Sequence, residues 1–556
     1  MSEMQFWTFL FLILTFGIYI TIAWRSRVKE TKEFYVASQG VPTIANGAAI
    51  AADWMSAASF IGMAGMIAFL GSDGSVYLMG WTGGYVLLAM LLAPYLRKWG
   101  KFTVPEFVGD RYDDKVRVVA AICAIIISFT YVVGQMTGGG VVFARFLGLS
   151  AEWAVLVAAV VIFFYAVLGG MKGITYTQVA QYVVMIIAYL IPAVAVSQQI
   201  GGFPLPQVTY GTILSELDAL RVQFGLDEFT EAFVGRDGGQ LDVFLVTLSL
   251  MLGTAGLPHV IIRFYTTKTV RGARYSAFWA LLFISLLYLT APAVGAFTKL
   301  NLLRSADGST ANDLPDWIGP WEEAGYVTLN SEGVIETVSN EVGSGADLIV
   351  SNDILVLASP EISGLPAPII GLMAAGGMAA ALSTAAGLML VISSAVSHDI
   401  YFRMIAKEQA SEKTQMRVGR LAMAAAVIVA IFAGLNPPAF VAQVVAFAFG
   451  LGASTFFPIL ILGIFWKKAN ATGAAAGMLT GLLVSGGYMI YTLELFGLQA
   501  NDHIFGISPE GVGAIGALVN FVVTIVVSNF TRPPSDHVQE MVEEIRYPQA
   551  RIPSSQ

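Results

Sequence analysis

Five hydroxyl side chains lie in one otherwise apolar stretch, AALSTAAGLMLVISSAVSHDI, which covers residues 380–400. They are Ser383, Thr384, Ser393, Ser394 and Ser397. At about 100° per residue of an α-helix, one stripe of mostly small or hydroxyl-bearing side chains is formed by Ala380, Ser383, Thr384, Gly387, Val391 and Ser394. Hydroxyls in such a helix either bond to the carbonyl of the preceding turn and pack against a neighbouring helix, or present oxygen atoms to a hard cation.

The five hydroxyls divide between these two interpretations. For Ser393, Ser394 and Ser397 we favour packing. For Ser383 and Thr384 we predict a sodium site, because the two residues are adjacent, lie near mid-span and follow Ala380 by one turn. A small side chain at Ala380 would let a backbone carbonyl face a neighbouring helix. Two hydroxyls and the carbonyls of an unwound helix would supply the oxygens that a hard cation needs, without a costly buried carboxylate.

The composition says what surrounds this helix. The chain has 556 residues, of which 56% are hydrophobic and 12% charged, and its mean hydropathy is +0.71. Soluble domains carry about 25% charged residues, so most of this surface must lie in lipid. The alternating ten-residue strands of a membrane barrel are not found. The single cysteine, Cys123, excludes an intramolecular disulfide and a cysteine metal cluster, and the diluted net charge of −8 does not indicate a nucleic-acid partner.

The apolar runs predict an all-α membrane protein. Thirteen spanning helices are expected, over 5–24, 44–70, 75–95, 117–147, 151–169, 175–197, 241–264, 275–299, 366–396, 417–434, 438–465, 471–495 and 510–530. The first has neither a basic region before it nor a small-residue cleavage site, so we interpret it as a retained helix and not as a signal peptide. The odd number places the two ends of the chain on opposite sides of the membrane.

Lys and Arg set the orientation. We place the first loop, RSRVKETKE, on the inside and let the helices alternate. Of the 30 Lys and Arg, all but five then lie inside; the five outside are Arg145, Arg221, Arg236, Lys299 and Arg304. This positive-inside bias predicts an external N-terminus and a cytoplasmic C-terminus in the cell membrane. The two long outer loops, 198–240 and 300–365, are acidic, and we favour a solvated cap over a cation-attracting vestibule. No GxxxxGK[ST] motif is present, which argues against ATP-driven transport.

Two of the spanning segments carry signals for a broken helix. The segment 44–70 places an acid, a tryptophan, two serines and several alanines near its centre, around Asp53–Ser59. The seventh segment places Gly253, Gly256 and Pro258 within six residues. Proline removes a backbone donor and clashes with the preceding turn, and glycine loosens the helix further. We therefore expect both helices to unwind.

The two breaks open two sets of five helices. A set of five crosses the membrane an odd number of times, so the second set is inverted relative to the first. Broken helices at corresponding positions of inverted halves point to a binding site. The predicted division is an extra helix and inner loop (1–43), the first repeat (44–197), an outer loop (198–240), the second repeat with its own outer loop 300–365 (241–465), two further helices (466–530) and a cytoplasmic tail (531–556).

A family resemblance rests on four motifs. These are FIGMAG (60–65), KFTVPEFVGDRY (101–112), GTAGLPHVIIRFYT (253–266) and the Ser383–Thr384 pair. Through them the chain resembles the sodium:solute symporters over about residues 40 to 480. Its likeness to the acetate permease branch rests on QMTGGG (135–140), GTAGLPH (253–259) and SAVSHDIY (394–401). The resemblance implies a leucine-transporter-type inverted-repeat fold, and sodium-coupled import of acetate or a similar short monocarboxylate by alternating access.

The resemblance also implies a ligand set. In the family, sodium lies between the unwound first core helix and the eighth. Aligned on FIGMAG without a gap, its ligands here would be backbone oxygens of Ala52 and Met55, the carbonyl of Ala380, and the hydroxyls of Ser383 and Thr384. One position departs from the pattern. Many members carry an aspartate in a W-T-D context where this chain has Gln178, which puts a second sodium or a proton relay there in doubt and favours one sodium per acetate.

A site for acetate needs donors for the carboxylate and an apolar wall for the methyl group. The predicted donors are Ser56 and Ser59 on the first broken helix, Gln135 and Thr137 on the third core helix, and Thr254 at the second break. Asp53 would repel acetate unless a cation paired with it. It is expected to be protonated, linked to sodium, or bonded to a polar packing partner.

Three alternatives stay open. The chain could be a sodium symporter for another small solute, such as an amino acid or a sugar, or a nutrient sensor on a transporter-like scaffold, and proton coupling is not fully separated from sodium coupling. An enzyme is not expected, since no paired catalytic carboxylates, nucleophile elbow or HExxH motif occur. Some relatives of this branch work beside a small two-helix membrane partner, which the sequence neither requires nor excludes.

Overall fold

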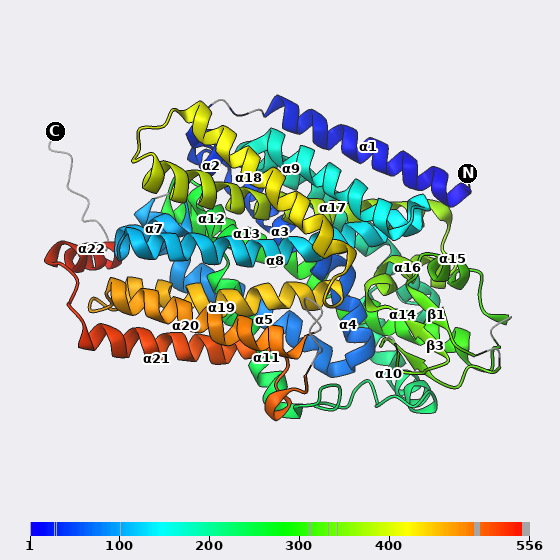
Figure 1. The fold of residues 1–556 in the computed structure, drawn as a ribbon. Coiled ribbons are helices and arrows are strands. Elements are labelled where there is room, and N and C mark those ends of the chain that lie inside the picture. Colours follow the sequence, from blue (N-terminus) through cyan, green and yellow to red (C-terminus); the bar gives the residue numbers. More distant parts are fainter. Residues whose placement is uncertain are drawn as a thin grey trace.

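The computed structural model describes residues 2–547 except 27, 29, 101, 311, 312, 332, 342 and 494–500. Long helices run roughly parallel through most of the molecule (Figure 1). A small sheet and several short helices lie at one end of this bundle, where α1 begins, and α22 lies at the opposite end. The bundle is what the apolar runs predict.

The predicted spanning segments of the first half all fall on helices, several of them interrupted. The elements are α1 (Glu3–Arg25), α3 (Thr43–Trp54), the π-helical η2 (Ala58–Gly62), α4 (Met63–Leu70), α5 (Ser75–Leu87), the π-helical η4 (Leu88–Leu92), α6 (Ala93–Trp99), α8 (Asp114–Leu147) and α9 (Ala151–Gly201). Gly170, with φ of 50°, breaks α9 between the fifth and sixth predicted segments.

The second half follows the same pattern. Its long elements are α11 (Gly239–Gly256), α12 (Pro258–Tyr265), α13 (Val270–Tyr288), α14 (Ala291–Ala306), α17 (Ala367–Ser394), the π-helical η7 (Ala395–Ile405), α18 (Glu412–Leu435), α19 (Val441–Phe465), α20 (Ala471–Thr492) and α21 (Val512–Phe530). The connections carry α2 (Thr31–Val36), η1 (Ala37–Gln39), η3 (Gly71–Gly74), α7 (Val104–Arg111), α10 (Pro206–Gln223), α15 (Ile318–Glu323), η6 (Asn352–Ile354), α16 (Leu355–Ile362), η8 (Ile504–Gly506) and α22 (Asp536–Arg546).

Within the described residues, eleven helical stretches are long and apolar enough to cross a membrane. One of them, Ala58–Trp99, merges parts of two predicted segments, and the fifth predicted segment appears as the shorter apolar helix Ala151–Phe164. The eleven stretches are therefore compatible with thirteen crossings. The residue boundaries of the two repeats stay a prediction.

The two long loops that the sequence predicts to lie outside contain more regular structure than the sequence suggested. The loop 198–240 contains α10, and the loop 300–365 contains α15, α16 and a three-stranded sheet. In that sheet β3 (Leu348–Val350) lies between β1 (Val327–Leu329), which is antiparallel to it, and β2 (Val338–Ser339), which is parallel to it. Short runs of β-branched and apolar residues form these strands, and β1 packs against α15.

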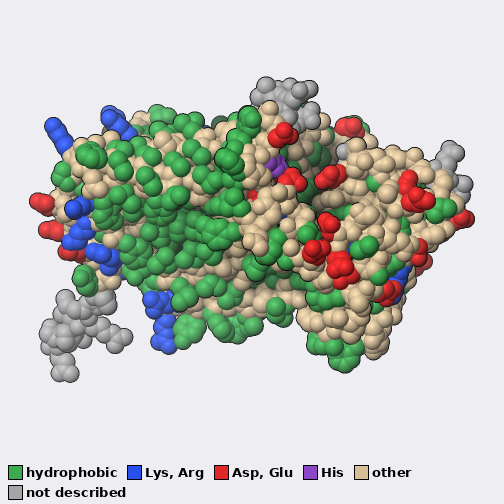
Figure 2. All heavy atoms as spheres, turned by 90° about the horizontal axis from the view of Figure 1, so that it is seen from below, with side chains coloured by type: hydrophobic (Ala, Val, Ile, Leu, Met, Phe, Trp, Pro, Cys, Tyr) green, Lys and Arg blue, Asp and Glu red, His purple; other side chains and the backbone are tan. Residues whose placement is uncertain are grey.

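The surface of the bundle has the polarity of a membrane protein. Figure 2 shows hydrophobic side chains over the middle of the molecule. Most of the visible Lys and Arg lie at the end near α22, together with a few Asp and Glu, and most of the visible Asp and Glu lie at the opposite end. Large apolar side chains on the long helices are openly exposed, among them Met90 (76%), Leu483 (71%) and Phe432 (70%). Such a band is stable only against lipid.

The hydroxyl-rich helix α17 lies at the centre of the bundle. It packs against α1, α8 and α9, and 94% of its most apolar window is buried. Small residues allow these contacts, since a Cβ on Gly376 would lie 2.4 Å from the Cβ of Ala188 on α9. The position of α17 explains why its polar side chains must find partners inside the protein.

Candidate functional site

The first broken helix unwinds inside the stretch where the sequence predicts it. The helix α3 ends at Trp54, and Met55 has φ of −75° and ψ of 60°. A helical conformation resumes at Ala57, before η2. This break lies beside the middle of α17, so carbonyl groups at the end of α3 face hydroxyls on the neighbouring helix.

The predicted sodium ligands meet at this junction. The Ser383 hydroxyl donates a hydrogen bond to the Ala52 carbonyl at 2.7 Å and is 3.0 Å from the carbonyl of Ala380. The Thr384 hydroxyl donates to the carbonyl of Asp53 at 2.6 Å. All of these residues are buried. The set consists of hydroxyl and carbonyl oxygens without thiols, which is the donor chemistry that suits sodium.

Met55 is the one member of the predicted set that is not tied to α17 in this way. It lies in the break, one residue beyond the end of α3, and in the described structure its carbonyl makes no hydrogen bond to Ser383 or Thr384. Its place in the unwound turn leaves that carbonyl outside the α3 ladder. The Asp53 carbonyl, which the sequence did not single out, is the oxygen that Thr384 contacts instead.

Asp53 is paired with a cation. Its Oδ2 atom lies 3.0 Å from Nε of Arg263 on α12, 210 residues along the chain. Its Oδ1 atom accepts a hydrogen bond from the Gln178 amide at 3.1 Å, and the same amide nitrogen lies 2.8 Å from the Ser383 carbonyl. The buried pair and Gln178 therefore adjoin the hydroxyl pair directly, and Asp53 carries no free charge toward a substrate.

Arg263 joins the two broken helices. A second nitrogen of its guanidinium donates to the Thr175 hydroxyl on α9 at 3.2 Å, and its backbone carbonyl accepts a hydrogen bond from the Asn46 amide on α3 at 3.2 Å. Sequence reasoning missed this residue. The signal was an arginine placed five residues after Pro258 in a spanning segment, where a charge needs a partner.

Gly387, on the predicted stripe of α17, makes room for this ion pair. A Cβ at this position would lie 2.6 Å from Oδ1 of Asp53, which is closer than carbon and oxygen atoms pack. The stripe is small at Gly387 because the Asp53 carboxylate lies against it.

We expect Gly387→Ala to lower stability by about 1–3 kcal/mol, the usual cost of an overpacked core. Thermal unfolding of the purified protein in detergent measures this. Gly487→Ala is the matched control, since no atom lies within 4 Å of a Cβ built on that glycine of α20, and alanine favours a helix over glycine by up to about 1 kcal/mol. Equal stability of the two variants would contradict the proposed packing.

The second broken helix opens between α11 and α12. Leu257 is extended, with φ of −77° and ψ of 119°, and Pro258 begins α12. Gly253 and Gly256 allow close packing. A Cβ on Gly253 would lie 2.1 Å from a backbone oxygen of α19, and a Cβ on Gly256 would lie 2.6 Å from another. The glycines thus allow α11 to approach α19, and the break itself lies at Leu257–Pro258.

The predicted substrate residues are all buried but differ in what their polar atoms do. The Gln135 side-chain oxygen accepts a hydrogen bond from the Ala57 amide at 3.0 Å, and its amide nitrogen has no partner in the described structure. The Thr254 hydroxyl is likewise without a partner among the described residues. These two residues therefore retain polar atoms that a ligand could engage.

The other three predicted substrate residues are engaged within the protein. Ser56 accepts a hydrogen bond from the Tyr131 hydroxyl at 3.2 Å. Ser59 contacts the Trp54 carbonyl at 3.2 Å and the Tyr288 hydroxyl at 3.0 Å. The Thr137 hydroxyl donates to the carbonyl one turn earlier at 3.1 Å. Ser56 lies in the break, whereas the contacts of Ser59 and Thr137 are those of packing residues.

Aromatic side chains surround the first break. The ring of Trp54 lies 5.3 Å from that of Tyr85, and the ring of Tyr131 lies 5.7 Å from Phe449 and 5.2 Å from His259. Such edge-to-face and tilted contacts form a compact apolar wall. The free amide of Gln135 comes from the same helix as Tyr131, one turn away, which places a donor near an apolar surface.

The remaining hydroxyls of the opening stretch behave as packing residues. Ser394 donates to the carbonyl of Val391 at 3.0 Å, and Ser397 donates to the carbonyl of Ser393 at 2.6 Å. A Cβ on Gly419 of α18 would lie 2.4 Å from the Ser393 hydroxyl. These are the back-bonds and close helix contacts that we expected for the three serines.

Comparison with known proteins decides the family. The family model described as the sodium:solute symporter family matches residues 34–311 and 345–481. The chain belongs to the sodium:solute symporter family. As a member of this family it is a transporter and not an enzyme, and it is a multi-pass membrane protein.

Individual relatives agree with this assignment. The symporter is 34% identical to an uncharacterized symporter of Cupriavidus necator, over 97% of this chain and 93% of the relative. It is 30% identical to a monocarboxylic acid transporter of Corynebacterium glutamicum, over 85% of this chain and 80% of the relative. A solved Na+-coupled sialic acid symporter in a substrate-bound outward-open state superposes with a TM-score of 0.72 at 16% identity, covering 95% of this chain and 98% of that one. This last likeness confirms the expected leucine-transporter-type fold.

Proposed function

We propose that this symporter imports acetate or a similar short monocarboxylate together with sodium, by alternating access. The observation that carries the sodium part is the meeting of the Ser383 and Thr384 hydroxyls with the carbonyls of Ala52 and Asp53 at a helix break. A cation between these oxygens would hold α3 and α17 together, and its departure would release them. That dependence is what couples an ion to a change of conformation.

The monocarboxylate part rests on the chemistry beside the two helix breaks. The free polar atoms of Gln135 and Thr254 suit a carboxylate, and the aromatic wall suits a methyl group. Arg263 already neutralises Asp53, so no unpaired negative charge there repels an anion. The relative of Corynebacterium glutamicum, which is named a monocarboxylic acid transporter, supports this substrate class.

We further propose one sodium per monocarboxylate. The Asp53 carboxylate is committed to Arg263, and Gln178 is neutral, so no free negative charge adjoins the hydroxyl pair to hold a second cation. The cycle then moves no net charge. A tenfold sodium gradient supplies about 1.4 kcal/mol, which is enough for about tenfold accumulation.

Uptake at a fixed sodium gradient should therefore be insensitive to membrane potential. Proteoliposomes clamped at 0 and −100 mV with potassium and valinomycin measure this, and the two accumulation ratios should agree. A second sodium would add about 2.3 kcal/mol per 100 mV, or roughly fifty-fold more accumulation. A large gain on hyperpolarisation would contradict the one-sodium cycle.

The orientation is part of the proposal. Lys and Arg gather at the end of the bundle near α22 (Figure 2), and the positive-inside rule assigns that end to the cytoplasm of the cell membrane. The N-terminus would then lie outside, with the sheet β1–β3 on the external face.

The experiment that tests the function is uptake of labelled acetate by the reconstituted chain. A sodium gradient, a proton gradient and no gradient are compared, with unlabelled propionate, amino acids and sugars as competitors. We expect sodium-driven uptake that only short monocarboxylates inhibit. Uptake that an amino acid or a sugar blocks would assign another substrate, and uptake driven by protons alone would contradict sodium coupling.

A further inference from the structure

The polar stripe of α17 continues past the sodium site to a small cavity. From Ser383 the stripe runs through Gly387 to Val391 and Ser394, which line a cavity of about 10 Å³ together with Asp399 of η7. Thr103 and the first residues of α7 also line the cavity, as do Pro258 and Ile262 of α12. The cavity holds about one particle the size of a water molecule, and sodium is no larger.

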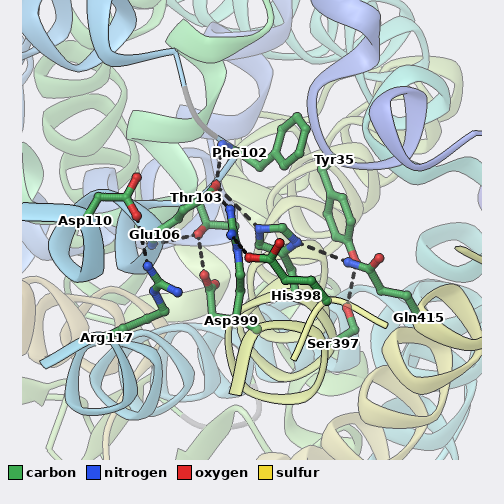
Figure 3. A network of polar contacts seen from close by, with 12 residues as sticks. Tyr35, Phe102, Thr103, Glu106, Asp110, Arg117, Ser397, His398, Asp399 and Gln415 are labelled. Carbon is green, nitrogen blue, oxygen red and sulfur yellow. Dashed lines mark hydrogen bonds and ion pairs between the residues drawn. The ribbon is translucent and has the colours of Figure 1, made fainter. Parts of the chain in front are cut away.

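The carboxylate of Asp399 at this cavity is only half satisfied. The residue is fully buried, and its Oδ1 atom accepts a hydrogen bond from the Thr103 hydroxyl at 2.9 Å (Figure 3). Its Oδ2 atom has no hydrogen-bond partner in the described structure, and none of the ion pairs formed by the described residues includes Asp399. A buried carboxylate in this condition is expensive unless a cation or a proton meets it.

The charged groups around Asp399 are committed elsewhere. Arg117 pairs with Asp110 at 2.9 Å and with Asp114 at 3.0 Å. Arg403 pairs with Glu106, whose other carboxylate oxygen lies 3.4 Å from the His398 ring. The ring of His398 is bonded on its far side to the Gln415 amide at 3.1 Å (Figure 3). Asp399 itself lines the cavity, so a counter-ion held there would meet its carboxylate.

The location of the cavity gives this counter-ion a role. Ser394 lies eleven residues after Ser383 on the same stripe, about 16 Å further along the helix at 1.5 Å per residue. This is the direction of the end where Lys and Arg gather. The wall opposite α17 is α12, the helix that holds Arg263 beside the sodium site.

We propose that Asp399, with the Thr103 hydroxyl and the oxygen of Ser394, which can face a cation while its proton stays bonded to Val391, forms an inner sodium site on the release path from Ser383–Thr384 to the cytoplasm. This inference rests on the proposed sodium coupling and orientation. The same ion occupies the two sites one after the other, so the ratio of one sodium per substrate is unchanged. A carboxylate near the exit gives the ion a second, weaker place to bind on its way from the site of neutral oxygens to the cytoplasm.

Binding of ²²Na⁺ to the purified full-length chain tests the proposal. Titrated to high sodium, the wild type should show a tight and a weak component. Asp399→Asn, which keeps the shape of the side chain, should weaken the second component at least tenfold and leave the first unchanged. Ser383→Ala should weaken the tight component and leave the weak one unchanged. Asp536→Asn, an exposed carboxylate on α22, is the control that should change neither.

The outcomes separate this site from the proposed function. Two results would overturn the inner site and keep the coupling site. In the first, the wild type shows only one component and Asp399→Asn leaves it intact. In the second, the weak component survives Asp399→Asn. A tight component that survives Ser383→Ala contradicts the coupling site. If Asp399→Asn does not fold, Ser394→Ala serves instead and should weaken only the second component, by several-fold. A weak component unaffected by Ser394→Ala would then overturn the proposal.

Discussion

Ser383→Ala is expected to raise the sodium concentration for half-maximal uptake by about 10- to 100-fold. The variant removes one hydroxyl oxygen from the site where it lies 2.7 Å from the Ala52 carbonyl and 3.0 Å from the Ala380 carbonyl. An interaction with a charged group contributes about 1.5–3 kcal/mol, which is about 10- to 100-fold in affinity. Thr384→Ala should act in the same direction, because its hydroxyl holds the Asp53 carbonyl.

Sodium titration of acetate uptake in proteoliposomes measures this effect. Ser393→Ala is the matched control, since Ser393 lies on the same helix, is equally buried, and makes no side-chain hydrogen bond in the described structure. We expect its half-maximal sodium concentration to stay within about twofold of the wild type. If Ser383→Ala and Ser393→Ala behave alike, the hydroxyl pair only packs helices, and the coupling ion binds elsewhere.

Neutralising one member of the Asp53–Arg263 pair is expected to destabilise the protein strongly. The two side chains are 3% and 1% exposed and lie 3.0 Å apart. Removing one partner of a buried ion pair leaves an uncompensated charge and costs about 3–5 kcal/mol. Asp53→Asn and Arg263→Met should each show this loss, whereas the double variant should recover most of it, because neutral residues of similar size then fill the site.

Thermal unfolding in detergent, followed for both single variants and the double variant, tests the coupling. Glu216→Gln provides the control, because the Arg304–Glu216 pair is 42% and 48% exposed and such surface pairs contribute about 0–1 kcal/mol. Additive losses in the double variant would show that Asp53 and Arg263 do not act as a pair. The double variant should still transport poorly, since Asp53 also binds Gln178 beside the Ser383 carbonyl.

The sequence by itself determined the helices, the breaks and the hydroxyl pair. Helical periodicity groups Ser383, Thr384 and Gly387 on one stripe of α17, and Pro258 marks the point where α11 gives way to α12. These signals depend only on neighbouring residues, so they can be recognised without knowledge of the fold. The positive-inside bias is also a property of the sequence, and the charges in Figure 2 are distributed as it requires.

Only the tertiary structure decided which groups meet. The partner of Asp53 is 210 residues away on α12, and no spacing rule connects the two positions. The same holds for Gln178, whose amide bridges Asp53 and Ser383 from α9. It holds too for Asp399, which joins η7 to Thr103, the residue just before α7. A buried charge is stable only with a partner, but which partner it finds depends on how the helices pack. The sequence therefore showed where a partner was needed, and the packing of α3, α9, α12 and α17 determined what it was.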